Sequence, residues 1–291
     1  SFLLRVWVRR RILAAIAAGE APEMAIAPSI HFEPLAGEAR WQQAGTPAVF
    51  ARFAALGYAD AGRYRVPEIA GMEVVFATHP DGTAAAIYDH AKVPTFFDVV
   101  RSATDETSVY VTTSPFHDPS HTPPGVVAIA DATLTPEQAV EWLRGLRSTG
   151  PLLPATAENV CALAAASYER QIAHILTSQA PSGEQMRAVG ERLSAATGEE
   201  PPALDDESLR FAAEIHRHVR ERALDDLILQ TFLRAAPFGA GEWERMRADV
   251  VVIHDRMSAE EREELLPDPE AAKSIGRVER PVPATIYWLP R

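Results

Sequence analysis

The sequence has little cysteine, little lysine and no long apolar run. Cys161 is the single cysteine, which excludes an intramolecular disulfide and favours a reducing compartment, so we expect a cytoplasmic protein. No segment reaches about 18 consecutive apolar residues, the length that a membrane-spanning helix needs. Lysine occurs only at Lys92 and Lys273, while arginine and alanine are frequent, a bias typical of a GC-rich bacterial genome.

Positive charge is also scarce. The net charge is −12, from 40 acidic and 28 basic residues, and this excludes nucleic acid as a partner because phosphate binding needs a positive field. Familiar catalytic motifs are missing too: the sequence has no Gly-x-Ser-x-Gly turn, no Walker-type phosphate loop and no dinucleotide-binding glycine pattern. We therefore predict no cofactor. The 47% hydrophobic content still suffices for the core of a globular protein.

Basic and aromatic residues come together near the N-terminus, at Arg5, Trp7, Arg9, Arg10 and Arg11. Basic residues stay on the cytoplasmic side of membranes and Trp favours the interface, so this segment is a candidate for contact with a membrane surface. The alternative is an ordinary amphipathic helix that packs on the protein body. In either case we predict a first region, 1–45, that consists of a basic helix and a proline-containing linker.

The region 46–150 is predicted to form a two-layer α+β domain. Segments between Met72 and Thr113 are rich in Val, Phe, Tyr and Thr and alternate in polarity, which is typical of strands. Asp81-Gly82 predicts a tight hairpin turn. Helix-start signals at Thr46-Pro47 and Thr135-Pro136 bracket these strands. We therefore expect an antiparallel sheet of about five strands with two helices on one face.

The region 151–291 shows an apolar period of 3.6, which predicts a mainly α-helical C-terminal region. The longest helix is expected to start at Asp205-Asp206, and the segment from Trp243 to Met257 is expected to form another. Asp225-Asp226, on the long helix, is interpreted as part of a solvated face. Residues 283–289 are strand-like and predict a C-terminal strand.

The loop that holds His117, Asp118 and His121 is the best polar cluster in the sequence. Two imidazoles and a carboxylate can bind a transition metal when they converge. A closed site needs three or four ligands, however, and an exposed loop shaped by its prolines explains the same residues. We therefore assign no metal ligand, and the three side chains are candidates for binding only.

Strand aromatics supply the remaining candidates, namely Tyr88, Phe96, Phe97 and Tyr110. Clefts between layers and domains are where ligands usually bind, and aromatic residues often line them. The alternative is that these side chains belong to the core, as strand aromatics commonly do.

Three functional hypotheses follow. The first is a non-catalytic interaction or sensing module with a protein partner, or with a membrane surface if the chain is the cytosolic part of a membrane-anchored bacterial protein. The second is an α+β protein that binds a small molecule. The third is a metal-dependent hydrolase that uses the His117-Asp118-His121 loop.

Overall fold

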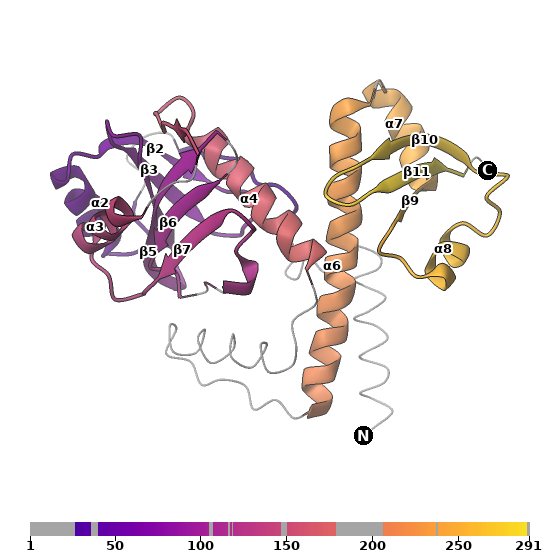
Figure 1. The fold of residues 1–291 in the computed structure, drawn as a ribbon, viewed down its shortest axis with the longest axis horizontal. Helices are drawn as coiled ribbons and strands as arrows, with labels where there is room; N and C mark the ends of the chain where they lie inside the picture. The colour runs from indigo at the N-terminus through magenta and orange to yellow at the C-terminus, as the bar shows by residue number, and fades with distance from the viewer. Residues whose placement is uncertain are drawn as a thin grey trace. The chain divides into compact units, whose positions relative to one another are not determined.

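The computed structural model describes residues 27–35, 40–104, 107–115, 117, 119–146, 150–178, 206–236 and 238–289 (Figure 1). The segment with Arg5, Trp7, Arg9, Arg10 and Arg11 lies outside these ranges, so the membrane-surface hypothesis stays a prediction. Among the helices in the described ranges, none is both long and apolar enough to cross a membrane.

The chain folds as two compact units. Among the described residues, the N-terminal unit comprises those between Ser29 and Ile172 together with residues 206–213, and the C-terminal unit comprises residues 27–28, 173–178 and those between 214 and 289. The division falls within helix α4 (Val160–Thr177).

The N-terminal unit is built on an eight-stranded sheet in the order β1-β2-β3-β4-β5-β6-β7, with β8 paired to β5. The strands are β1 (Glu33–Pro34), β2 (Ala59–Arg65), β3 (Glu73–Thr78), β4 (Ala84–His90), β5 (Val93–Ala103), β6 (Ser108–Thr112), β7 (Val126–Ala130) and β8 (Leu152–Leu153). All neighbours are antiparallel except β6 and β7, which run parallel. The prediction of about five strands is therefore too small, although the sheet is mostly antiparallel as expected.

The β3–β4 hairpin forms where the sequence predicts it. The His79 N–H donates to the Thr83 carbonyl at 2.9 Å, and Thr78 pairs with Ala84. Gly82 has φ +84°, a backbone conformation that glycine adopts without a Cβ clash.

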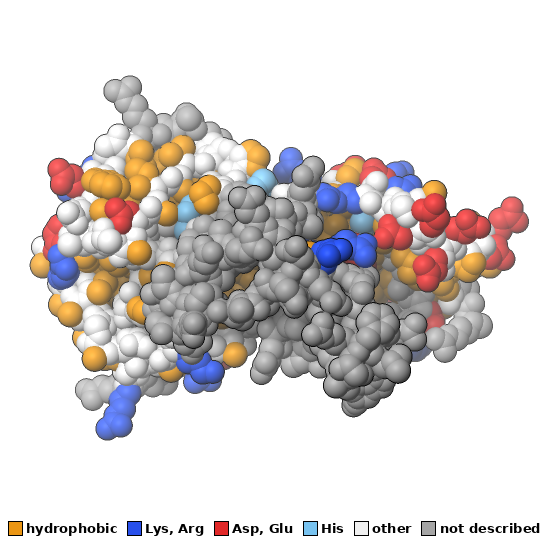
Figure 2. Space-filling model, turned by 90° about the horizontal axis from the view of Figure 1, so that it is seen from below, with side chains coloured by type: hydrophobic (Ala, Val, Ile, Leu, Met, Phe, Trp, Pro, Cys, Tyr) orange, Lys and Arg blue, Asp and Glu red, His pale blue; other side chains and the backbone are white. Residues whose placement is uncertain are grey.

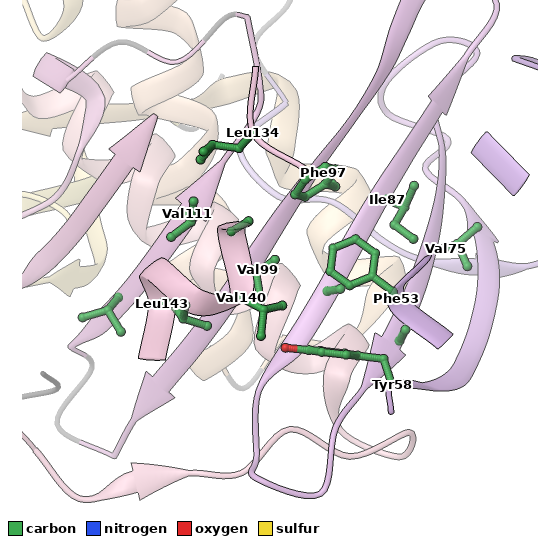
Figure 3. Close-up of a cluster of buried hydrophobic side chains, with 14 residues drawn as sticks. Phe53, Tyr58, Val75, Ile87, Phe97, Val99, Val111, Leu134, Val140 and Leu143 are labelled. Atoms are coloured by element: carbon green, nitrogen blue, oxygen red, sulfur yellow. The ribbon is translucent and has the colours of Figure 1, made fainter. Parts of the chain in front are cut away.

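Helices α2 (Thr46–Ala55) and α3 (Pro136–Gly145) pack on one face of this sheet (Figure 3). Phe53 of α2 is fully buried, with its ring 5.1 Å from that of Phe97 and 5.4 Å from that of Tyr58. The core of this face consists of Phe53, Tyr58, Val75, Ala77, Ala85, Ile87, Phe97, Val99, Val109, Val111, Leu134, Ala139, Val140 and Leu143. Alternate residues of each strand point to the same face, which explains why every second strand residue appears in this set.

The opposite face is covered over β2–β4 by the first half of α4. Val160 is buried there with Val74 and Phe76, while Ala164 and Tyr168 pack against the same cluster. Burial on both faces gives these central strands their nearly continuous apolar sequence.

A buried carboxylate anchors the segment before α2 to the sheet. Asp89 of β4 has no exposed surface and accepts the backbone N–H groups of Gln42 and Gln43, each at 2.8 Å. The Thr46 hydroxyl donates to it at 2.9 Å, and the Arg63 guanidinium at 3.2 Å. A buried charge is tolerated only when it is paired and hydrogen-bonded, and Asp89 is both.

The C-terminal unit combines helices with a small sheet. Its helices are α6 (Asp206–Ala235, from Glu214 onward), α7 (Ala240–Met246) and α8 (Ala259–Leu265). Its strands are β9 (Val250–His254), β10 (Lys273–Val278) and β11 (Ala284–Trp288), antiparallel in the order β10-β11-β9. The prediction of a mainly helical region is thus only partly right, whereas the predicted C-terminal strand is confirmed as β11.

The helix predicted between Trp243 and Met257 is wrong in its second half. That half contains β9, which pairs with β11 through five residues from Val250 to His254. A short apolar run suits a buried helix or a buried strand equally well, and here the pairing with a distant strand decides.

Gly276 lets α6 pack closely on β10. A Cβ at this position would lie 2.2 Å from Cε2 of Phe232, a buried residue of α6. Real Cβ atoms essentially never approach a carbon this closely, so the contact needs glycine.

Candidate functional site

Two of the predicted aromatics, Tyr88 and Tyr110, lie on the sheet face opposite α2 and α3, on strands that flank β5. Between them, on β5, is Asp98, whose Oδ2 accepts the Tyr88 hydroxyl at 2.9 Å. Burial raises the pKa of Asp98, although hydrogen bonds from Thr112 and Tyr88 oppose the shift. The structure therefore brings both tyrosines to one polar cluster.

The predicted histidine loop adds His117 to this cluster. The His117 Nδ1 lies 3.3 Å from the Tyr110 hydroxyl, and the two rings meet edge to face at 6.0 Å. His121 lies nearby in sequence, in a short 3-10 turn from Pro119 to His121, and Asp118 is outside the described residues. Across the ranges that the structure describes, no three His, Cys, Asp or Glu side chains are placed to hold a metal ion.

Phe97 does not join these residues. It points to the other face, where it is 4% exposed and packs on Phe53. Its neighbour Phe96 instead stacks on Tyr88, with ring centroids 4.5 Å apart. Because successive strand residues alternate between faces, only one of the two phenylalanines can share the face of Tyr88.

A cavity of about 330 Å³ lies within the C-terminal unit. Part of its lining is apolar, from Leu176, Leu224, Met257 and Leu265, and part is charged or polar. Its volume lies at the lower end of the range of about 300–1,000 Å³ that is usual for small-molecule sites. Among the residues that the structure describes, this cavity is the strongest candidate site.

Helix α6 supplies the largest share of the lining. Arg217, Arg220, Glu221, Leu224 and Asp225 follow one another at the i, i+3, i+4, i+7 and i+8 positions, and all five line the cavity. This spacing places them in one stripe, because a helix turns once every 3.6 residues.

Two arginines of the lining satisfy the C-terminal carbonyls of α4. Arg220, 5% exposed, donates from Nη2 to the carbonyls of Ile175 and Ser178, the latter at 3.0 Å. Arg256 donates to the carbonyls of Thr177 and Ser178. The last carbonyls of a helix have no partner within the helix, and cations stabilise that end of the dipole.

His254, at the end of β9, and Asp225 of α6 lie next to each other in the lining of the cavity. The His254 Nε2 lies 3.7 Å from Asp225 Oδ1, which exceeds a hydrogen-bond length. The backbone N–H of Arg256 donates to His254 Nδ1 at 3.2 Å. Because Nδ1 is thus an acceptor, the neutral ring carries its proton on Nε2, the nitrogen 3.7 Å from Asp225 Oδ1.

The surroundings of His254 and Asp225 favour the uncharged form of each side chain. Burial, reinforced by Asp226 and Glu221 and opposed by Arg222, raises the pKa of Asp225 from 3.8 to about 7. Burial lowers the pKa of His254, and the positive charge of Arg256 lowers it further. Two titratable groups with shifted pKa values in one cavity are a common mark of a functional site.

Sequence reasoning missed this cavity. It assigned Asp225 to a solvated face, which is wrong, because the side chain is only 33% exposed and its Oδ1 is buried without a hydrogen bond among the described residues. The stripe of charged residues on α6 is a signal that could have indicated it. His254 has no such signal, because the pairing of β9 with β11 brings it into place.

Figure 2 shows acidic side chains gathered on the surface of the C-terminal unit, with several Lys and Arg side chains beside them. Helix α8 contributes to the negative charge, since four of its seven residues, in Ala-Glu-Glu-Arg-Glu-Glu-Leu, are glutamates. An acidic exterior disfavours the approach of anions.

Comparison with protein-family models, with curated proteins and with solved structures found no match, so the residues themselves carry the functional argument.

Proposed function

We propose that this protein is a non-catalytic binding protein that senses a small molecule in the cavity of its C-terminal unit. The observation that carries the proposal is Asp225, which lines a cavity of about 330 Å³ and whose Oδ1 is buried with no hydrogen bond from the described residues. Such an atom costs about 1–3 kcal/mol if it stays unsatisfied, and a bound polar group would remove that cost.

The other polar groups of the lining support binding rather than covalent chemistry. The hydroxyl of Ser178 donates to the Ile175 carbonyl at 2.9 Å and also accepts from Arg220, so it is held as part of the α4 terminus. An activated serine would instead be hydrogen-bonded to a general base. The protein's single cysteine, Cys161, is outside the cavity lining, and burial raises the pKa of its thiol.

A small-molecule screen tests this proposal. Methyl-labelled methionine reports on the cavity through Met257 and on the N-terminal unit through Met72, which serves as an internal control. Compounds from a metabolite library that raise the melting temperature are then titrated by NMR. We expect at least one to move the Met257 signal and leave the Met72 signal unchanged.

A cavity-filling variant is the matched control. Leu265 lines the cavity and is 41% exposed, so Leu265→Trp adds bulk at the rim with little disturbance of the core. The variant should lose the compounds that move Met257. If no compound moves Met257, or if all hits bind the variant as well as the wild type, the proposal is wrong.

A further inference from the structure

The chemistry of the cavity also indicates which kind of molecule fits it, an inference that rests on the proposed function. At its polar end, His254 and Asp225 face each other at 3.7 Å without a direct hydrogen bond. The backbone N–H of Arg256 fixes Nδ1 of His254 as an acceptor, so Nε2 presents a donor. The carboxylate opposite presents an acceptor, Oδ1, which is buried without a hydrogen bond from the described chain.

The position of the histidine is held from two sides. Arg262 donates to the His254 carbonyl at 3.2 Å, and the ring is held by the Arg256 N–H on its far nitrogen. His254 is only 6% exposed. A donor held in this way needs a hydrogen-bond acceptor inside the cavity, because it cannot turn toward solvent.

We infer that the cavity binds a neutral molecule through one hydroxyl group, which accepts from His254 Nε2 and donates to Asp225 Oδ1. An oxygen about 2.8 Å from each atom can span the 3.7 Å separation, since the two atoms are too far apart for a direct hydrogen bond. A hydroxyl is the simplest group that supplies one acceptor and one donor at the same oxygen.

Other polar groups of a ligand would form a hydrogen bond with only one of the two atoms, His254 Nε2 or Asp225 Oδ1. A carboxylate accepts from His254 but has no proton for Asp225, and it adds a like charge beside that carboxylate. An ammonium group donates to Asp225 but cannot accept from His254. An ether oxygen accepts from His254 and cannot donate.

The arginine side chains that line the cavity do not change this preference for a neutral hydroxyl group. Arg220 and Arg256 are engaged with the terminal carbonyls of α4, and Arg217 pairs with Glu221 at 3.3 Å. An anion would therefore have to share each guanidinium group with these contacts. The acidic exterior in Figure 2 further disfavours an anionic ligand.

The apolar part of the lining indicates what the rest of the ligand should be. Leu176, Leu224, Met257 and Leu265 form the apolar part, so the hydroxyl should be attached to a compact hydrocarbon body. Cyclohexanol is a suitable probe of this class.

Four probes with the same ring separate the head groups: cyclohexanol, methoxycyclohexane, cyclohexylammonium and cyclohexanecarboxylate. Each is titrated against methionine-labelled protein at about pH 8, where a carboxyl of pKa about 7 is ionised. The Met257 signal reports binding. Cyclohexanol should bind at least about tenfold more tightly than the methyl ether, the factor expected for one hydrogen bond to a charged group.

The substitution His254→Phe removes the donor and keeps a ring of similar size. It should reduce the affinity for cyclohexanol and for the methyl ether alike, by about two- to tenfold, the factor expected for one neutral hydrogen bond. His31→Phe is the matched control, because this histidine is exposed in the N-terminal unit and pairs with Glu68. It should leave the affinity unchanged.

The outcomes separate this inference from the proposed function. Equal affinities for alcohol and ether would show that solvent, and not the ligand, bridges His254 and Asp225, and would overturn the inference. Tighter binding of the ammonium or carboxylate probe would overturn it too, while leaving a ligand-binding cavity in place. If none of the four probes moves the Met257 signal while a compound of the metabolite library does, the inference is wrong and the proposed function stands; if no compound of either set moves it, both are wrong.

Discussion

Replacing Asp225 by asparagine should make the protein more stable at alkaline pH. Asp225→Asn keeps the shape of the side chain and removes its ionisation. In the folded protein burial raises the pKa of this carboxyl from 3.8 to about 7. The folded state therefore holds the proton more tightly than the unfolded chain does, and ionisation at high pH works against folding.

The sign and the pH window follow from this shift. The carboxyl contributes its full stability below about pH 4, and the contribution is lost as the pH rises through about 7. At about 1.4 kcal/mol per pKa unit, the shift sets a ceiling of about 4 kcal/mol. The side chain is 33% exposed, so solvent screening reduces the expected effect to about 1–2 kcal/mol.

Urea denaturation between about pH 5 and pH 9 measures the effect, with hydrogen exchange of α6 to identify the transition of the C-terminal unit. The variant should exceed the wild type by about 1–2 kcal/mol near pH 8, and the difference should shrink toward pH 5.

Glu261→Gln is the opposite-sign control, because hydrogen bonds from Ser258 lower the pKa of Glu261 and its ionised form favours folding. A stability difference between Asp225→Asn and wild type that does not change with pH would refute the buried environment described for Asp225.

Two further substitutions test the packing and the anchoring of the fold. Gly276→Ala should destabilise the C-terminal unit by about 1–3 kcal/mol in urea denaturation, because the new Cβ meets the Phe232 ring, whereas Gly241→Ala, with open space around its Cβ, should not. An equal effect of the two would contradict the close contact. Asp89→Ala should cost about 3–5 kcal/mol and expose the amides before α2 to hydrogen exchange, because it leaves Arg63 and two backbone N–H groups without this acceptor. A loss below about 1 kcal/mol would show that Asp89 does not anchor this segment.

Local signals in the sequence predict the parts of the fold whose causes are local. The hairpin at Gly82 needs only a turn residue between two alternating strands, and it forms. Helix α3 starts with the predicted capping box, in which Thr135 accepts from the Gln138 N–H and Gln138 accepts from the Thr135 N–H.

Long-range pairing determines what the sequence does not predict. Strands β1 and β8 have two residues each, too few for any periodicity, and they exist because β2 and β5 offer partners. In the same way β9 is a strand because β11 lies beside it. The extent of both sheets therefore depends on contacts between residues far apart in the chain.

The same distinction applies to the candidate sites. The sequence predicts Tyr88, Tyr110 and His117 one by one; in the structure Tyr88 is hydrogen-bonded to Asp98, and Tyr110 to His117. The pair in the cavity could not be predicted in this way, because Asp225 is on a helix and His254 is on a strand. Their environment is created by the packing of α6, β9 and the end of α4.

The most direct test of the proposed binding cavity is the affinity ratio of cyclohexanol and methoxycyclohexane, measured from the Met257 signal near pH 8. The structure predicts that the alcohol binds at least about tenfold more tightly than the ether in the wild type, because only the alcohol donates to Asp225. In His254→Phe both probes should bind more weakly while this ratio persists, because the variant removes a donor that both oxygens use. A ratio close to one in the wild type, or an unchanged affinity of cyclohexanol in the variant, would contradict the hydroxyl inference.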